Sequence, residues 1–121
     1  MGTVTTITFI FNASPSTVTF LNVAQDRSSW TLDSGVGQHI SWGVPWAGNP
    51  NEFNTQHIEV QVSSALTYFI WQSSENDGDW VRQSTDGFHY SGQHMWPSGF
   101  TGDARALIIR ADSSLYLGAT G

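Results

Sequence analysis

The chain of 121 residues contains no cysteine and no lysine, and only 12% of its residues are charged. The lack of cysteine excludes a disulfide framework and thiol chemistry. All four cations are arginines, against ten carboxylates, so the formal net charge is −6. Nucleic acids and anionic membranes need a basic surface on their partner, which this composition does not supply. We therefore expect no nucleic-acid partner, and a membrane partner is not favoured.

Long hydrophobic runs and extended helical periodicity are also missing. The stretch 3–11 is too short and too rich in threonine for a signal peptide or a membrane span. The cellular location therefore stays open: the protein is either cytoplasmic or secreted without a classical signal, or the sequence is that of a mature form. A length of 121 residues with 39% hydrophobic content predicts one folded domain over residues 1–121.

What the sequence does contain is a series of short segments in which apolar and polar residues alternate. They are rich in β-branched and aromatic residues, which is typical of strands with one buried face. The segments are 3–11, 17–23, 28–32, 38–44, 56–62, 66–72, 80–84, 104–111 and 115–117. About nine short strands separated by turn residues predict an all-β fold. We expect an antiparallel β-sandwich, with a small β-barrel as the alternative.

The first segment illustrates what alternation predicts about packing. Ile7, Phe9 and Phe11 fall on one face, which we expect to point into the core. The segment is expected to pair with 17–23 as a hairpin. As a flat edge strand with few charges, 3–11 could also pair with a second copy and form a homo-oligomer.

Six tryptophans are the most prominent feature of the composition. Three lie within strand patterns and are expected in the core, namely Trp30, Trp42 and Trp71. The other three lie in or beside turns and loops, where they either anchor the loop or meet a ligand: Trp46, Trp80 and Trp96. Their neighbours are short polar side chains in the stretches 45–55, 75–80 and 86–103.

This mixture of groups favours carbohydrate recognition. An aromatic face stacks on the apolar face of a sugar ring, while carboxylates, amides and backbone groups pair with the hydroxyls. We expect a lectin-like module that recognises glycans or glycoproteins and is not an enzyme, since the sequence contains no catalytic motif. The expected ligand-binding residues are Trp46, Asn49, Asn51, Asp77, Asp79, Trp80, Asp86, His89, Tyr90 and Trp96. The overall composition is similar to that of small lectin-like and carbohydrate-binding β-sandwiches, a resemblance that implies no residue roles.

Two other functions remain open. A membrane-active or toxin-like β protein would use exposed aromatic side chains to enter a lipid interface. A metal-dependent enzyme would use His57 with Glu59, two residues apart on one strand face, or the loop histidines His89 and His94.

No cofactor is required by the lectin-like hypothesis, although Ca²⁺ is an alternative. Four carboxylates near one hairpin are hard oxygen ligands of the kind that Ca²⁺ prefers: Glu75, Asp77, Asp79 and Asp86. Their spacing does not match an EF-hand loop. The triplet Asn12-Ala13-Ser14 matches a glycosylation acceptor, a pattern that arises easily by chance.

Overall fold

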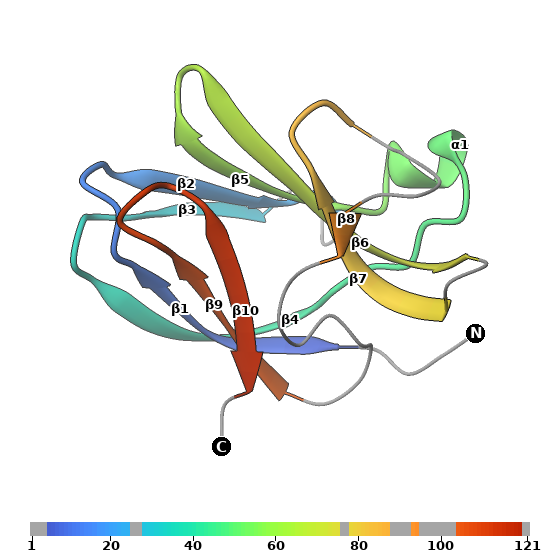
Figure 1. Cartoon of the computed structure of the whole chain (residues 1–121), viewed down its shortest axis with the longest axis horizontal. Coiled ribbons are helices and arrows are strands. Elements are labelled where there is room, and N and C mark those ends of the chain that lie inside the picture. The colour runs from blue at the N-terminus through green and yellow to red at the C-terminus, as the bar shows by residue number, and fades with distance from the viewer. Residues whose placement is uncertain (1–4, 25–27, 76–77, 88–92, 95–103, 120–121) are drawn as a thin grey trace.

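The structure is a computed structural model, and it describes residues 5–24, 28–75, 78–87, 93–94 and 104–119. Ten strands and one short helix lie within these ranges. The strands are β1 (Thr6–Asn12), β2 (Val18–Asn22), β3 (Ser28–Leu32), β4 (Gly37–Gly43), β5 (Ile58–Ser63), β6 (Leu66–Glu75), β7 (Gly78–Ser84), β8 (Gln93–His94), β9 (Ala104–Ile109) and β10 (Leu115–Ala119), and the helix is α1 (Pro50–Phe53). Two sheets that do not close into a barrel confirm the predicted all-β sandwich (Figure 1).

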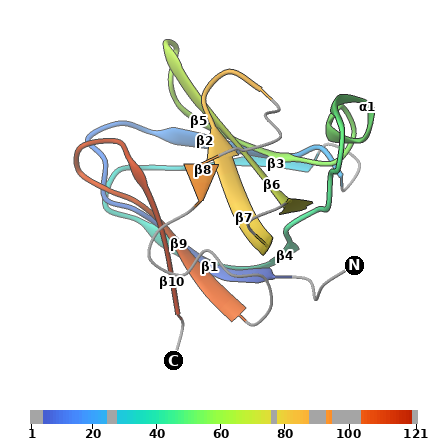
Figure 2. The same ribbon diagram turned by 45° about the vertical axis from the view of Figure 1, so that its right-hand side comes forward.

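The smaller sheet has four strands in the order β10-β9-β1-β4, and the larger has six in the order β3-β2-β5-β6-β7-β8. In both views α1 lies beside the larger sheet, away from β9 and β10 (Figure 1, Figure 2). No helix within the described ranges has the length and apolar content that crossing a bilayer requires.

The pairing of β1 corrects three sequence-based expectations. β1 and β2 belong to different sheets, so they do not form a hairpin. β1 lies between β9 and β4, so it is not an edge strand that could pair with a second copy. It runs parallel to β9, whereas the other neighbouring strands in both sheets are antiparallel. Each of these features depends on contacts between distant segments, which local alternation does not report.

The core lies between the two inner faces. It contains fully buried aliphatic and aromatic side chains, among them Ile7, Ile10, Phe20, Ile58, Val60, Ile70, Leu107, Ile109 and Leu117. Trp42 belongs to this core, and Trp30 packs against it with the two ring centroids 5.6 Å apart. Trp71 is fully buried in a second cluster with Ala47 and Phe53. The prediction that the three strand tryptophans pack in the core is therefore confirmed.

A β-bulge in β1 changes which of its side chains reach the core. Ile7 and Phe9 pair with the successive residues Arg105 and Ala106 of β9, so Thr8 is an extra residue in β1. One extra residue reverses the alternation beyond it. Ile7 and Ile10 are consequently buried, while Phe9 is only half-buried. The expectation that Phe9 and Phe11 face inward with Ile7 is wrong for this reason.

Candidate functional site

Half of the ten residues expected to bind a ligand have side chains that the structure does not describe. Four of them lie outside the described residues, namely Asp77, His89, Tyr90 and Trp96. Asp79 is described only as part of the backbone of β7. The remaining five are Trp46, Asn49, Asn51, Trp80 and Asp86.

Trp46 and Trp80 lie on opposite faces of the larger sheet. Trp46 forms a parallel bridge with Gln72, and Trp80 pairs with the next residue, Ser73. Paired residues share a face, whereas successive residues of a strand face opposite ways. The indole Nε1 of Trp46 is also buried, with no hydrogen-bond partner among the described residues. These two side chains therefore do not present a common surface to a sugar.

The described polar members of the expected site lie on two segments, α1 with its cap and the stretch that follows β7. Asn49 caps α1, because its side-chain oxygen accepts a hydrogen bond from the Glu52 N–H at 2.9 Å. Asn51 is exposed on α1, and Asp86 is exposed after β7. Asp86 is also the one member of the proposed calcium cluster whose side chain is described.

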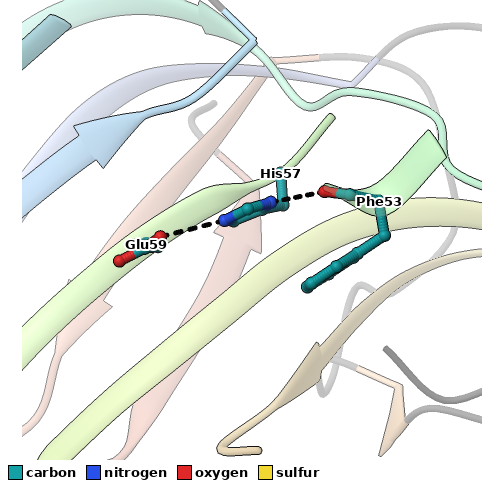
Figure 3. Close-up of polar contacts among 3 residues, drawn as sticks. All are labelled: Phe53, His57 and Glu59. Carbon is teal, nitrogen blue, oxygen red and sulfur yellow. Dashed lines mark hydrogen bonds and ion pairs between the residues drawn. The ribbon is translucent and has the colours of Figure 1, made fainter. Parts of the chain in front are cut away.

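The structure brings His57 and Glu59 together (Figure 3), as the sequence suggests, and it buries the histidine. The Nδ1 atom of His57 lies 2.6 Å from the Phe53 carbonyl oxygen, and Nε2 lies 3.0 Å from Glu59 Oε2. The imidazole also stacks on the Phe53 ring, with centroids 4.5 Å apart. Sequence alternation predicts that His57 faces solvent, which is wrong because α1 folds over it.

This arrangement engages both ring nitrogens of His57. A carbonyl oxygen only accepts, so Nδ1 is the donor to Phe53. A metal ion at Nε2 would have to replace the contact with Glu59. Within the described ranges, three or more His, Cys, Asp or Glu side chains do not gather as a metal site. The described geometry thus supports a packing role for His57, which fastens α1 to the larger sheet.

Replacing His57 by phenylalanine tests that role. The change keeps an aromatic ring against Phe53 and removes both polar contacts, so we expect the free energy of unfolding to fall by about 1 kcal/mol. The loss stays modest because the Phe53 carbonyl also accepts from the Gln56 N–H. Urea unfolding measures it, with the exposed Thr55 changed to serine as a control. An unchanged stability would contradict the role.

A different set of residues does converge, on the outer face of the smaller sheet. The strand register aligns Gly118, Ala106, Phe9 and His39 in one row across β10, β9, β1 and β4. The adjacent row contains Tyr116, Ile108, Phe11 and Gly37. One row therefore has small side chains on two of its strands, and the other has large side chains on three.

A depression of about 470 Å³ opens on this face, lined by Thr8, Phe9, His39 and Ala106. We refer to it as the Ala106 depression. The Phe9 and His39 rings form one wall, with centroids 5.0 Å apart and planes tilted by 59°. The bulge contributes directly, because the half-buried Thr8 and Phe9 side chains both border the depression.

Two glycines shape the ends of the two rows. A Cβ atom on Gly118 would lie 2.6 Å from Cε2 of Tyr116, so the tyrosine ring lies over Gly118. A Cβ atom on Gly37 would lie 2.6 Å from Cζ of Phe9 and 3.1 Å from Cδ1 of Phe11. The absence of side chains at these positions lets the aromatic rings lie flat against the sheet.

The smaller sheet is also nearly free of charge. The four strands contain no aspartate or glutamate, although the chain has ten carboxylates, and Arg105 is their one charged residue. Arg105 precedes Leu107, which is buried, by two positions and therefore shares its inward side. The outer face thus offers rings, a hydroxyl and an imidazole without a formal carboxylate.

Comparison with protein-family models, with curated proteins and with solved structures gives no significant match.

Proposed function

We propose that the protein binds carbohydrate, and that the Ala106 depression is the site. The observation that carries the proposal is an open depression of about 470 Å³ bordered by an aromatic ring, an imidazole and a hydroxyl, on a sheet whose four strands contain no carboxylate. The proposed site does not include the tryptophans Trp46, Trp80 and Trp96.

The chemistry of these groups suits a sugar. The apolar face of a pyranose ring packs on an aromatic ring such as Phe9 and loses contact with water there. The hydroxyls at the rim of the sugar need donors and acceptors, which the His39 ring nitrogens and the Thr8 hydroxyl supply. A shallow site of this kind holds its ligand with few polar contacts, so shape and stacking contribute most of the affinity.

A lipid interface is less well supported. The larger apolar side chains of the described residues are buried or half-buried, except for Val36, which is 45% exposed. A membrane-active protein would present a contiguous apolar patch. The half-buried rings of the smaller sheet are instead interrupted by His39, Thr8 and two glycines.

Two substitutions test the proposal on a glycan array, followed by calorimetric titration of the best ligand. Phe9→Ala removes the stacking surface, and we expect at least tenfold weaker binding, which corresponds to about 1.4 kcal/mol. Ala106→Leu fills the depression without removing any polar group, and we expect it to abolish binding. Both side chains lie on the outer face, so we expect both variants to fold, with a lower melting temperature for Phe9→Ala because that ring packs against His39.

Trp80→Ala is the matched control, since it removes an aromatic ring from the other sheet. We expect it to leave the affinity within twofold of the wild type. The proposal would be rejected if no glycan bound, or if Trp80→Ala abolished binding while Phe9→Ala and Ala106→Leu did not.

A further inference from the structure

The aromatic rings of the outer face are placed on strands that are not neighbours. Tyr116 lies on β10 and Phe9 on β1, with β9 between them. Adjacent strands are about 4.8 Å apart, so the two ring-bearing strands are separated by roughly 10 Å. That separation is larger than one pyranose ring and close to the length of a disaccharide unit in an extended chain.

Among the described residues, the row between the two rings carries no large side chain. In the row that crosses the strands, Gly118 on β10 and Ala106 on β9 lie on the Tyr116 side of Phe9. Neither has a side chain longer than a methyl group. The Tyr116 ring lies over Gly118 and therefore stands at the end of this row. A ligand that follows the row meets Tyr116, then the Ala106 floor, then Phe9 and His39.

The charges near the path are balanced. Arg110 lies beside Tyr116, with its guanidinium carbon 5.8 Å from the ring centroid. Hydrogen bonds from Ser114, together with the nearby Arg110, hold the pKa of Asp112 below its usual value, so this turn keeps both charges at neutral pH. An acidic ligand would gain little net attraction, whereas the Arg110 N–H groups can still donate to hydroxyls.

We infer that the site takes a linear, uncharged oligosaccharide that lies across the strands from Tyr116 to His39, rather than a single sugar. This inference rests on the proposed function and adds the ligand class and its direction. Tyr116 does not line the Ala106 depression, so we expect a monosaccharide held there to contact Phe9 and not Tyr116. A longer chain contacts both rings and buries more apolar surface, so it binds more tightly.

The test is a length series of linear uncharged oligosaccharides, from one to six units of glucose, mannose or xylose, titrated calorimetrically. With wild-type protein we expect the affinity to rise by at least tenfold along the series and then to level off. With Tyr116→Ala we expect that gain to disappear, while the shortest ligands that bind keep their affinity within twofold. With Phe9→Ala we expect every member to bind more weakly.

Gly118→Ala provides a second variant in case Tyr116→Ala folds poorly. The new methyl group meets only the far end of the Tyr116 side chain, which can move aside, so the fold should persist while the ring leaves the row. We expect the same selective loss for the longer ligands.

Several outcomes would overturn the inference while leaving carbohydrate binding intact. These are an affinity independent of length, an equal loss for all lengths in Tyr116→Ala, and tighter binding of a uronic-acid series than of the neutral one. Failure of every saccharide to bind would instead remove the proposed function itself.

Discussion

Changing Asn12 to alanine is expected to lower the free energy of unfolding by about 3 kcal/mol, because the side chain satisfies several buried polar groups at once. Its Nδ2 donates to the carbonyl oxygens of Ser16 and Leu32 at 2.8 and 2.9 Å. Its Oδ1 accepts from the N–H and the hydroxyl of Ser14 at 3.0 and 2.6 Å. The residue is fully buried where the chain leaves β1 and crosses to the other sheet.

Alanine would leave these groups without their partner in a place that water does not reach. The loss should appear in urea unfolding as a shift of the midpoint with little change in slope. Asn51→Ala is the matched control, since Asn51 is exposed, and it should stay within about 0.5 kcal/mol of the wild type. A loss below 1 kcal/mol for Asn12→Ala would show that the crossover does not depend on this amide.

The burial of Asn12 also bears on whether the triplet Asn12-Ala13-Ser14 can accept a glycan. In the folded protein its amide nitrogen is engaged in two hydrogen bonds and has no exposed surface. The triplet therefore serves the turn between the sheets, where asparagine and serine side chains pair with the backbone. Its match to a glycosylation acceptor does not describe an accessible site.

Strand positions could be predicted where the information is local. The segment 28–32 coincides with β3, and the inward positions of β5 are Ile58, Val60 and Val62, all of them buried. Alternation within one strand is enough for such predictions, because it needs no knowledge of the partner strands. The two-sheet architecture followed from the number and spacing of these segments.

The reversal in β1 was not predictable in that way. The irregularity at Thr8 exists only relative to the partner strands β4 and β9, and β9 lies almost a hundred residues along the chain. No local signal in 3–11 distinguishes a bulged strand from a regular one. Strict alternation therefore assigned Phe9 and Phe11 to the core, although the structure turns them toward the outer face.

The Ala106 depression is not visible in the sequence for a related reason. Tryptophans are the most prominent side chains in the sequence, yet Trp46 and Trp80 lie on opposite faces of the larger sheet. The Ala106 depression is instead made of residues that look ordinary in sequence, a threonine, a phenylalanine, a histidine and an alanine. They become neighbours only when β1 pairs with β4 on one side and with β9 on the other.

Changing Gln72 to leucine is expected to cost about 2–3 kcal/mol, through loss of a polar link between the two sheets. Gln72 is fully buried on β6. Its Oε1 accepts from the N–H and the hydroxyl of Thr5 at 3.2 and 2.7 Å. Its Nε2 donates to the Val44 carbonyl oxygen at 2.6 Å. One side chain of the larger sheet thereby holds the start of β1 and the exit of β4.

Leucine has a similar volume, so the effect should come from lost hydrogen bonds rather than from a cavity. Gln61→Leu makes the same chemical change at an exposed position of β5 and should alter stability by less than about 0.5 kcal/mol. Because Gln72 holds one end of the smaller sheet, we also expect the Gln72→Leu change to speed up amide hydrogen exchange relative to the wild type. The increase should be larger in β1 and β4 than in β9 and β10. Two results would refute a specific link at Gln72: an equal increase in exchange across the four strands, or an equal loss of stability in the two leucine variants.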